Sequence, residues 1–89
     1  MQLLQINPED NVCVAMVTIK ADQLMHMINC IKVVCARNEI PAGHKVANAK
    51  ILNGKDVVKG GVVIGKAIQD INPGEHVHSH NLVSNYLNG

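Results

Sequence analysis

The chain has 89 residues, of which 47% are hydrophobic, and a formal net charge of +1 at pH 7. A chain of this length favours a single small domain over residues 1–89, with little interior left for a deep active site. The near-neutral charge, without a basic stripe, predicts no binding to nucleic acid. Tyr86 is the only aromatic residue, so the chain also lacks the rings on which bases or sugar rings stack.

Cysteine usage and hydropathy indicate the compartment. Cys13, Cys30 and Cys35 are odd in number and have no Cys-x-x-Cys spacing, which predicts buried thiols in a reducing environment. No secretory signal peptide stands ahead of them, so the sequence predicts a cytoplasmic protein. The longest apolar run, residues 12–17, is too short to span a bilayer, and we expect no association with a membrane.

Short apolar runs rich in Val and Ile, which both favour strands, follow one another along the chain. Gly and Pro residues separate these runs, a rhythm that favours many short strands over a helical bundle. The segment 21–29 fits either a helix or a strand pair, and residues 48–54 fit one helical turn. In chain order, the predicted strands are Val12–Val17, Ile31–Ala36, Val62–Ala67 and His76–His80. The sequence therefore predicts a mainly β fold with at most one or two short helices.

A short turn pattern recurs along the chain. Ile40–Val46 matches Ile71–Val77, with Ile, Gly and Val at the same offsets and a Pro inside each turn. Gly and Pro at these positions are typical of a tight turn between two strands. Ile19–Asp22 fits a third copy with Asp in the glycine position, since Asp tolerates left-handed backbone better than most residues. The repeats predict a chain built from β-turn-β units.

Three of the five histidines stand at alternate positions, at His76, His78 and His80. On a strand they would project from one face, with neighbouring Cα atoms about 6.5–7 Å apart and the outer pair about 13 Å apart. Two neighbouring imidazoles can bind one divalent ion, but all three cannot do so unless the strand bends. A polar edge strand, whose histidines bond to backbone or water, explains the same pattern without any function.

His44 and Lys45 follow a Pro-Ala-Gly turn. A His-Lys pair at this place is suited to a carboxylate substrate, with Lys as a point charge and His as a donor or base. The alternative is a solvated turn tip with no ligand. His26, which lies between two methionines, is expected to be a half-buried histidine without a functional role.

Three motifs together carry a family resemblance. They are Ile40–Ala47, Gly54–Ala67 and Ile71–Asn81, and they follow one another in the same order as in the family. The chain resembles the SAF domain of the altronate and galactarate dehydratase family, and also the small subunit of sulfolactate sulfo-lyase. It departs from the family pattern at Gly60, where an aromatic residue is usual, and at Asp22.

The resemblance implies a β-clip fold, in which bent hairpins fold over one another. It also implies the N-terminal part of a fused dehydratase, or a small subunit beside a larger catalytic lyase subunit, that takes part in metal-dependent β-elimination from an open-chain sugar acid. Its Val-His-x-His-Asn motif assigns metal-binding and catalytic roles to His78 and His80 and a substrate-binding role to Asn81, beside His44 and Lys45. Two imidazoles with few carboxylates nearby favour Fe²⁺, Mn²⁺ or Zn²⁺ over Mg²⁺, and Fe²⁺ or Mn²⁺ is the expected cofactor.

Two other classes of function fit the same residues. One is a non-catalytic module that binds a polyhydroxy acid or a metal, and the other is a structural domain that holds a large subunit in place. Within the enzyme class, the small subunit of a sulfolactate sulfo-lyase is the alternative to a dehydratase. Assembly into a homo-oligomer is compatible with the sequence. A gene for a large lyase subunit beside this one would distinguish a lyase subunit from an independent binding module.

Overall fold

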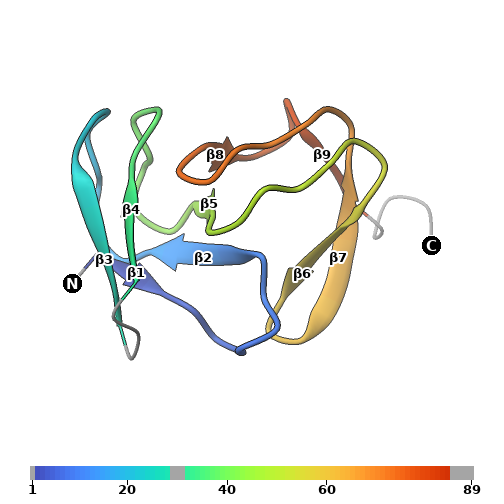
Figure 1. Ribbon diagram of the computed structural model, residues 1–89, viewed down its shortest axis with the longest axis horizontal. Helices are drawn as coiled ribbons and strands as arrows, with labels where there is room; N and C mark the ends of the chain where they lie inside the picture. Colours follow the sequence, from blue (N-terminus) through green and yellow to red (C-terminus); the bar gives the residue numbers. More distant parts are fainter. Residues whose placement is uncertain (1, 29–31, 85–89) are drawn as a thin grey trace.

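The computed structural model describes residues 2–28 and 32–84, which contain nine strands and no helix (Figure 1). The strands are β1 (Leu3–Leu4), β2 (Val12–Ala15), β3 (Leu24–Ile28), β4 (Val33–Cys35), β5 (Lys45–Ala47), β6 (Asp56–Lys59), β7 (Val62–Ala67), β8 (His76–Val77) and β9 (Leu82–Ser84). The predicted mainly β fold is therefore confirmed. Both helical alternatives are wrong where the structure describes them, because β3 occupies most of 21–29 and a bend, a bridge and a turn occupy 48–54.

The strands form two sheets. A six-stranded mixed sheet has the order β4-β3-β1-β2-β5-β8, and a three-stranded antiparallel sheet has the order β6-β7-β9. In Figure 1 hairpin β3–β4 stands at the left and hairpin β6–β7 at the right, with β2, β5 and β8 between them. This curled arrangement of short hairpins agrees with the β-clip fold that the resemblance implies.

The predicted strands agree with the structure to different extents. Val62–Ala67 coincides with β7, and Val12–Val17 extends beyond β2, which ends at Ala15. Ile31–Ala36 contains β4, although Ile31 lies outside the described residues. The prediction of buried thiols holds for Cys13 and is wrong for Cys35, which is exposed.

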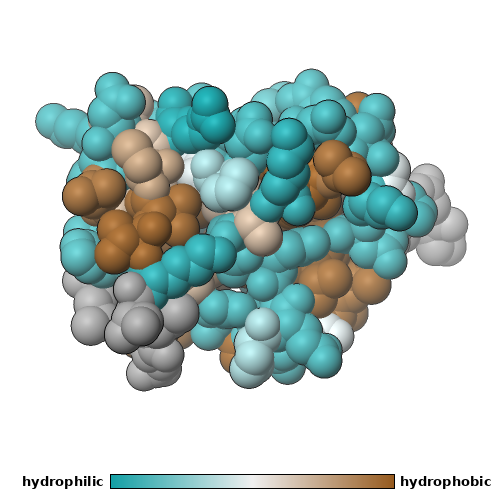
Figure 2. Space-filling model, viewed as in Figure 1, coloured by the Kyte–Doolittle hydropathy of each residue, from teal (hydrophilic) through white to brown (hydrophobic). Residues whose placement is uncertain are grey.

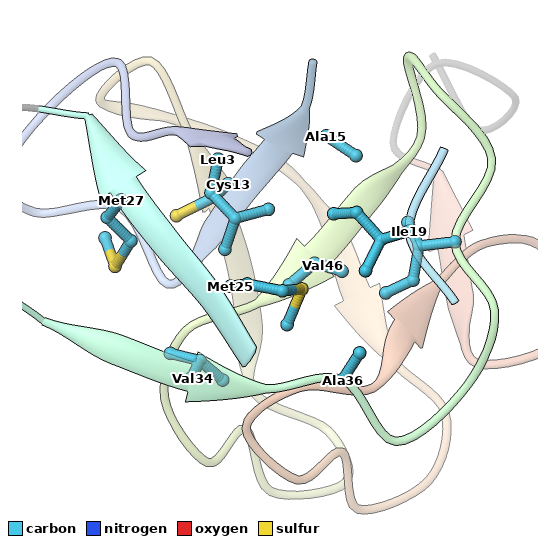
Figure 3. Close-up of a cluster of buried hydrophobic side chains, with 10 residues drawn as sticks. Leu3, Cys13, Ala15, Ile19, Met25, Met27, Val34, Ala36 and Val46 are labelled. Atoms are coloured by element: carbon cyan, nitrogen blue, oxygen red, sulfur yellow. The ribbon is translucent and has the colours of Figure 1, made fainter. Parts of the chain in front are cut away.

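Two clusters of buried apolar side chains form the core. Val12 and Cys13 are neighbours on β2 but belong to different clusters, because successive side chains of a strand point to opposite faces. The first cluster, drawn in Figure 3, contains Leu3, Cys13, Ala15, Ile19, Met25, Met27, Val34, Ala36, Ile40 and Val46. The second contains Val12, Ala47, Ile51, Val57, Ala67, Ile71 and Val77. The central strand is therefore covered on both sides, as its uninterrupted apolar sequence suggests.

The predicted turn pattern occurs four times. Each copy has a buried Ile, a turn residue at positive φ and then a buried Val or Met, and the copies are Ile19–Met25, Ile40–Val46, Ile51–Val57 and Ile71–Val77. The turn residues are Asp22 (φ 69°), Gly43 (φ 85°), Gly54 (φ 86°) and Gly74 (φ 90°). A positive φ at the third residue alone defines a type II turn. The interpretation of Asp22 as a substitute for glycine is confirmed.

These copies pair two by two through the same contacts. Ile19 bridges to Ile40, and Ile51 bridges to Ile71. In each pair, the turn residue of one copy donates its N–H to the carbonyl of an alanine that precedes the partner copy. The bonds run from Asp22 to Ala36, Gly43 to Ala15, Gly54 to Ala67 and Gly74 to Ala47, at 2.7–2.8 Å. Residues 15–46 (the first half) and 47–77 (the second half) are thus built alike, with hairpin β3–β4 equivalent to hairpin β6–β7.

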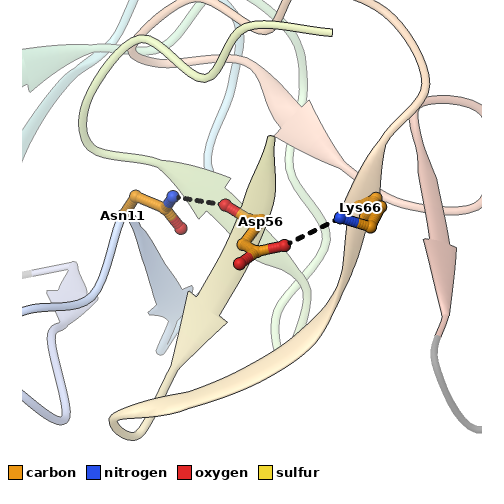
Figure 4. A network of polar contacts seen from close by, with 3 residues as sticks. All are labelled: Asn11, Asp56 and Lys66. Atoms are coloured by element: carbon orange, nitrogen blue, oxygen red, sulfur yellow. Dashed lines mark hydrogen bonds and ion pairs between the residues drawn. The ribbon is translucent and has the colours of Figure 1, made fainter. Parts of the chain in front are cut away.

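Asn11 and Asp10 attach the N-terminal segment to the β6–β7 hairpin. The Asn11 amide donates to Asp56 O (2.9 Å) and accepts from Val58 N (2.8 Å). Figure 4 shows the first of these bonds beside the ion pair between Lys66 and Asp56, at 3.2 Å. Both side chains of that ion pair are more than half exposed, so water screens it and it contributes little to stability.

The Asp10 carboxylate is 5% exposed and accepts three backbone N–H groups, from Asn7 (3.0 Å), Gly60 (2.8 Å) and Gly61 (2.8 Å). Gly60 and Gly61 both have positive φ, as the type I′ turn of a hairpin requires. Burial alone would raise the pKa of Asp10, but the N–H donors, led by Gly61 and Gly60, lower it below 3.8. Asp10 therefore binds the hairpin tip as a carboxylate.

We expect Asp10→Asn to destabilise the fold by about 2 kcal/mol, because hydrogen bonds to a charged acceptor are stronger than those to an amide. Since the native pKa lies below the unfolded one, this stabilisation is present above about pH 4 and is lost as the pH falls through the native pKa. Urea unfolding at pH 7 and at pH 3 measures both effects, with exposed Glu9→Gln as the control. Equal stability of wild type and Asp10→Asn at pH 7 would contradict this role.

Among residues 2–28 and 32–84, the structure contains no helix that is long and apolar enough to cross a membrane.

Candidate functional site

Three histidines meet where β5 and β8 pair. His44 ends the turn before β5, His76 lies in β8, and His78 follows β8 directly. The strands are antiparallel with Lys45 opposite Val77, so His44 comes to lie across from His78. Because side chains alternate between the faces of a strand, all three rings project from the same face.

The rings form a compact group. His44 Nδ1 and His76 Nε2 lie 2.9 Å apart, at hydrogen-bond distance. The ring centroid of His44 is 5.0 Å from that of His76 and 4.7 Å from that of His78, and those of His76 and His78 are 5.4 Å apart. His44 and His76 are half-buried, whereas His78 is exposed. One ligand atom from each ring lies within 4.8 Å of the other two. We call these three residues the histidine triad.

The triad fits a transition-metal ion. With metal–nitrogen bonds of about 2.0–2.1 Å, two nitrogens on one ion lie between about 2.9 and 4.2 Å apart, depending on the angle. The His44–His76 separation of 2.9 Å falls in this range, and the exposed His78 ring needs only a small inward movement. Three nitrogen donors without a carboxylate suit Fe²⁺ or Zn²⁺ better than Mn²⁺ or Mg²⁺. Three protein ligands would leave room for a substrate or water at the ion.

A turn past Val77 positions His78 in the triad. The N–H groups of Asn81 and Leu82 both donate to His78 O, at 3.0 and 2.9 Å. The predicted strand His76–His80 is therefore wrong beyond Val77, because the chain turns at His78 and no longer forms strand bonds. The turn brings the His80 ring to within 5.6 Å of His76, measured between centroids, but the third ring of the triad comes from His44 on the neighbouring segment.

Asn81 holds this turn from inside. Its side chain is 0% exposed; its Oδ1 accepts from His78 N (2.9 Å), and its Nδ2 donates to His76 O (2.9 Å). The Asn38 side chain accepts from His76 N at 3.1 Å. Asn81, expected from the sequence to bind substrate, thus lies behind the histidines and orders their backbone.

His80 and Lys45, the other sequence-predicted site residues, lie near the triad but outside it. His80 is exposed on the same turn, and its ring centroid lies 5.6 Å from that of His76, but it is not one of the three grouped ligands. Lys45 is half-buried next to His44 in β5. The structure thus groups His78 with His44 and His76 rather than with His80. The roles of all these residues remain predictions.

Burial and neighbouring charge lower the pKa of His76 below 6.5. Burial contributes most, followed by the other histidines, first His44, then His80 and His78, and by Lys45. Burial, and then the charge of Lys59, also lowers the pKa of Lys45. A lowered pKa keeps His76 in the neutral form that can bind a metal, because a protonated imidazole has no lone pair to donate.

We expect the His76 ring to titrate below pH 6.5 in the metal-free protein, as followed by its NMR ring signals. The unfolded chain then binds the proton more readily, so this group makes the fold less stable as the pH falls below 6.5. Replacing His44 with Gln removes a neighbouring charge and should move the His76 titration upward. A His76 titration above 6.5 in wild type would contradict the described environment.

The chain matches, over residues 1–85, the family model described as the altronate/galactarate dehydratase SAF domain. The all-β fold and this match together show that the chain belongs to that family. It is 38% identical over 85 residues to altronate dehydratase of Escherichia coli, and 37% identical over 82 residues to altronate dehydratase of Bacillus subtilis. These matches cover 96% and 92% of the chain.

A second kind of relative matches a shorter part. The chain is 44% identical over 46 residues to (2R)-sulfolactate sulfo-lyase subunit alpha of Chromohalobacter salexigens, which is 52% of this chain and 49% of that subunit. By contrast, it spans only 17% and 16% of the two altronate dehydratases. Most of each altronate dehydratase thus has no counterpart in this chain.

Proposed function

We propose that this chain is the SAF-domain part of a carbon–oxygen lyase, which removes water from an open-chain sugar acid such as altronate together with a larger catalytic chain. The histidine triad is the observation that carries this proposal. It offers three metal-binding nitrogens on one face of the β5–β8 pair, and His78 is exposed. A second chain can therefore complete the site.

The elimination requires a base for the proton next to the carboxylate, stabilisation of the resulting enediolate, and an acid for the leaving hydroxyl. His44, His76 and His78 would hold a divalent transition metal, Fe²⁺ for preference, which supplies Lewis-acid stabilisation of the enediolate. His44, expected from the sequence to bind substrate, is on this proposal a ligand. His76, to which the sequence assigned no role, is on this proposal also a metal ligand.

His80 and Lys45 are proposed to act on the substrate. His80 is exposed beside His76, outside the triad, so its ring nitrogen is available to take up or deliver a proton. The Lys45 ammonium would attract the substrate carboxylate as a point charge. Asn81 would order the turn that carries His78 and His80. The remaining acid or base would come from the larger chain.

A sulfolactate sulfo-lyase subunit is the second candidate, because the local identity to subunit alpha is higher than that to the altronate dehydratases. In that case the leaving group is sulfite rather than water, while removal of the proton and stabilisation of the enediolate are unchanged. A non-catalytic module that binds a metal or a polyhydroxy acid is the third candidate.

One reconstitution experiment separates these candidates. The purified chain, a larger lyase chain encoded near its gene, and the mixture are each assayed with Fe²⁺ on altronate, galactarate and sulfolactate. We expect each chain alone to be inactive and the mixture to eliminate water from a sugar acid. Turnover by the chain alone would overturn the subunit role. Metal binding without activity in any mixture would leave the binding module.

A further inference from the structure

The two halves of the domain differ in what covers their hairpins. In the second half, β7 pairs with β6 on one side and with β9 on the other, where Ala67 lies opposite Leu82 and Gly65 opposite Ser84. In the first half, β4 is the equivalent of β7, and it pairs with β3 alone at the edge of the six-stranded sheet. Among the described residues, nothing takes the place of β9 beside β4.

The two halves also share an equivalent hydrogen bond just after β4 and β7, and beyond this bond their chain paths differ. Ile68 N donates to Asn81 O (3.0 Å) in the second half, and Arg37 N donates to Gly74 O (2.9 Å) in the first. From Asn81 the chain continues along β7 as β9, whereas from Gly74 it turns away into β8 and pairs with β5. The edge of β4 therefore has a place for a strand that the domain itself does not fill.

The backbone of β4 is oriented for such a strand. Met27 N bonds Lys32 O, and Ala36 N bonds Gln23 O. In an antiparallel pair, hydrogen-bonded residues alternate with residues whose N–H and C=O point away. Val33 and Cys35 are the alternate residues, so their backbone groups point away from β3. The Cys35 carbonyl lies against Gly74, which leaves the N–H and C=O of Val33 available to another strand.

A groove of about 710 Å³ lies at β4, and its lining includes Val33 and Cys35 together with Asn48, Ala49 and Pro73. Figure 2 shows hydrophobic side chains gathered over the β3–β4 side of the molecule, where Leu24 is 59% and Val33 45% exposed. Lys32 and Arg37 also line the groove, and among the described residues Arg37 makes no ion pair. The groove thus combines an open strand edge, apolar side chains and positive charge.

We propose that an extended, carboxylate-bearing segment of the larger lyase chain adds to β4 as an antiparallel strand, as β9 adds to β7. This inference rests on the proposed function, because the altronate dehydratases carry a much longer chain beside the matched part. Backbone bonds to Val33 supply the pairing, apolar side chains pack beside the exposed Val33 side chain, and acidic side chains meet Arg37. Strand β9 approaches β7 closely at Gly65, where a Cβ would lie 2.1 Å from Val83 O. The equivalent residue of β4 is Val34, which has a side chain, so the added strand would lie at the ordinary strand spacing.

Cys35 is a natural reporter for this edge, because it is exposed whereas Cys13 is buried. In a Cys30→Ser background, N-ethylmaleimide labels Cys35 alone. We expect the labelling rate to fall at least about tenfold when the larger chain that confers activity is added, since docking buries this edge. Labelling at an unchanged rate in an active complex would overturn the inference and leave the proposed function standing. Protection that grows with the concentration of this chain alone would also overturn it, by identifying a second copy as the occupant.

A matched pair of variants tests the backbone contact. Val33→Pro removes the outward N–H at a position where an edge strand tolerates proline, and we expect it to weaken binding of the larger chain at least about tenfold. Val33→Ala keeps that N–H and should weaken binding less than about threefold. Arg37→Glu should weaken binding as well. Equal binding by Val33→Pro and Val33→Ala would contradict strand addition, and failure of every larger chain to bind would overturn both proposals.

Discussion

Replacing both His44 and His76 with alanine is expected to weaken transition-metal binding at least about a hundredfold, since it removes two of three nitrogens from one ion. These two residues contribute the closest pair of donors, 2.9 Å apart. They are also half-buried, so the ring positions are fixed before a metal arrives. Anaerobic calorimetric titration of the purified chain with Fe²⁺, and in air with Zn²⁺, measures the loss.

Two single variants serve as controls for the double variant. His26 is exposed on β3, so the expectation that it is half-buried is wrong. His26→Ala should leave metal binding unchanged. His80→Ala should weaken metal binding only slightly, because His80 is not one of the three grouped ligands. Wild-type affinity in the His44→Ala, His76→Ala variant would exclude the triad as the metal site. A large loss with His80→Ala would instead support the pair His78 and His80 that the sequence motif suggests.

Gly74→Ala is expected to cost about 4 kcal/mol or more, a large share of the total stability of a domain of this size. The residue has a φ of +90°, and a Cβ there would lie 1.9 Å from the carbonyl oxygen of Cys35. Both the left-handed backbone and the contact with a rigid main chain oppose the substitution. Urea unfolding followed by circular dichroism measures the cost.

Gly43→Ala is the matched control, because Gly43 holds the same position in its own copy of the turn. Its φ is +85°, but a Cβ there meets nothing within 4 Å. Its cost should therefore be only the backbone term, about 1–2 kcal/mol. Equal costs at Gly43 and Gly74 would show that the contact with Cys35 adds nothing.

The sequence predicts much of the fold because its signals are local. The Val and Ile runs mark strands, and the Gly43 and Gly74 turns mark the places where the chain reverses. The copy at Ile51–Val57 is not among the sequence predictions, although Gly54 stands at the expected offset. Segment 21–29 was ambiguous because its apolar residues fit a helical face as well as a strand.

The site was less predictable, because it depends on pairing between distant segments. The repeat already aligns Gly43 with Gly74, but only the antiparallel β5–β8 register brings His44 to His76. The His76–His80 strand was wrong because the side chain of Asn81 stabilises a turn, a contact that alternation of residues does not reveal. The turn depends on the buried side-chain amide of Asn81. The sequence shows that an Asn is present but not that its side chain is buried.

We propose that this domain supplies the metal-binding histidines of a two-part lyase. The most direct test is to strip metal from the complex with the larger chain and then restore Fe²⁺ while following elimination of water from the sugar acid. We expect the wild-type complex to regain its activity, whereas the complex carrying His44→Ala and His76→Ala still assembles but remains inactive. Equal recovery of activity by both complexes would contradict the proposal.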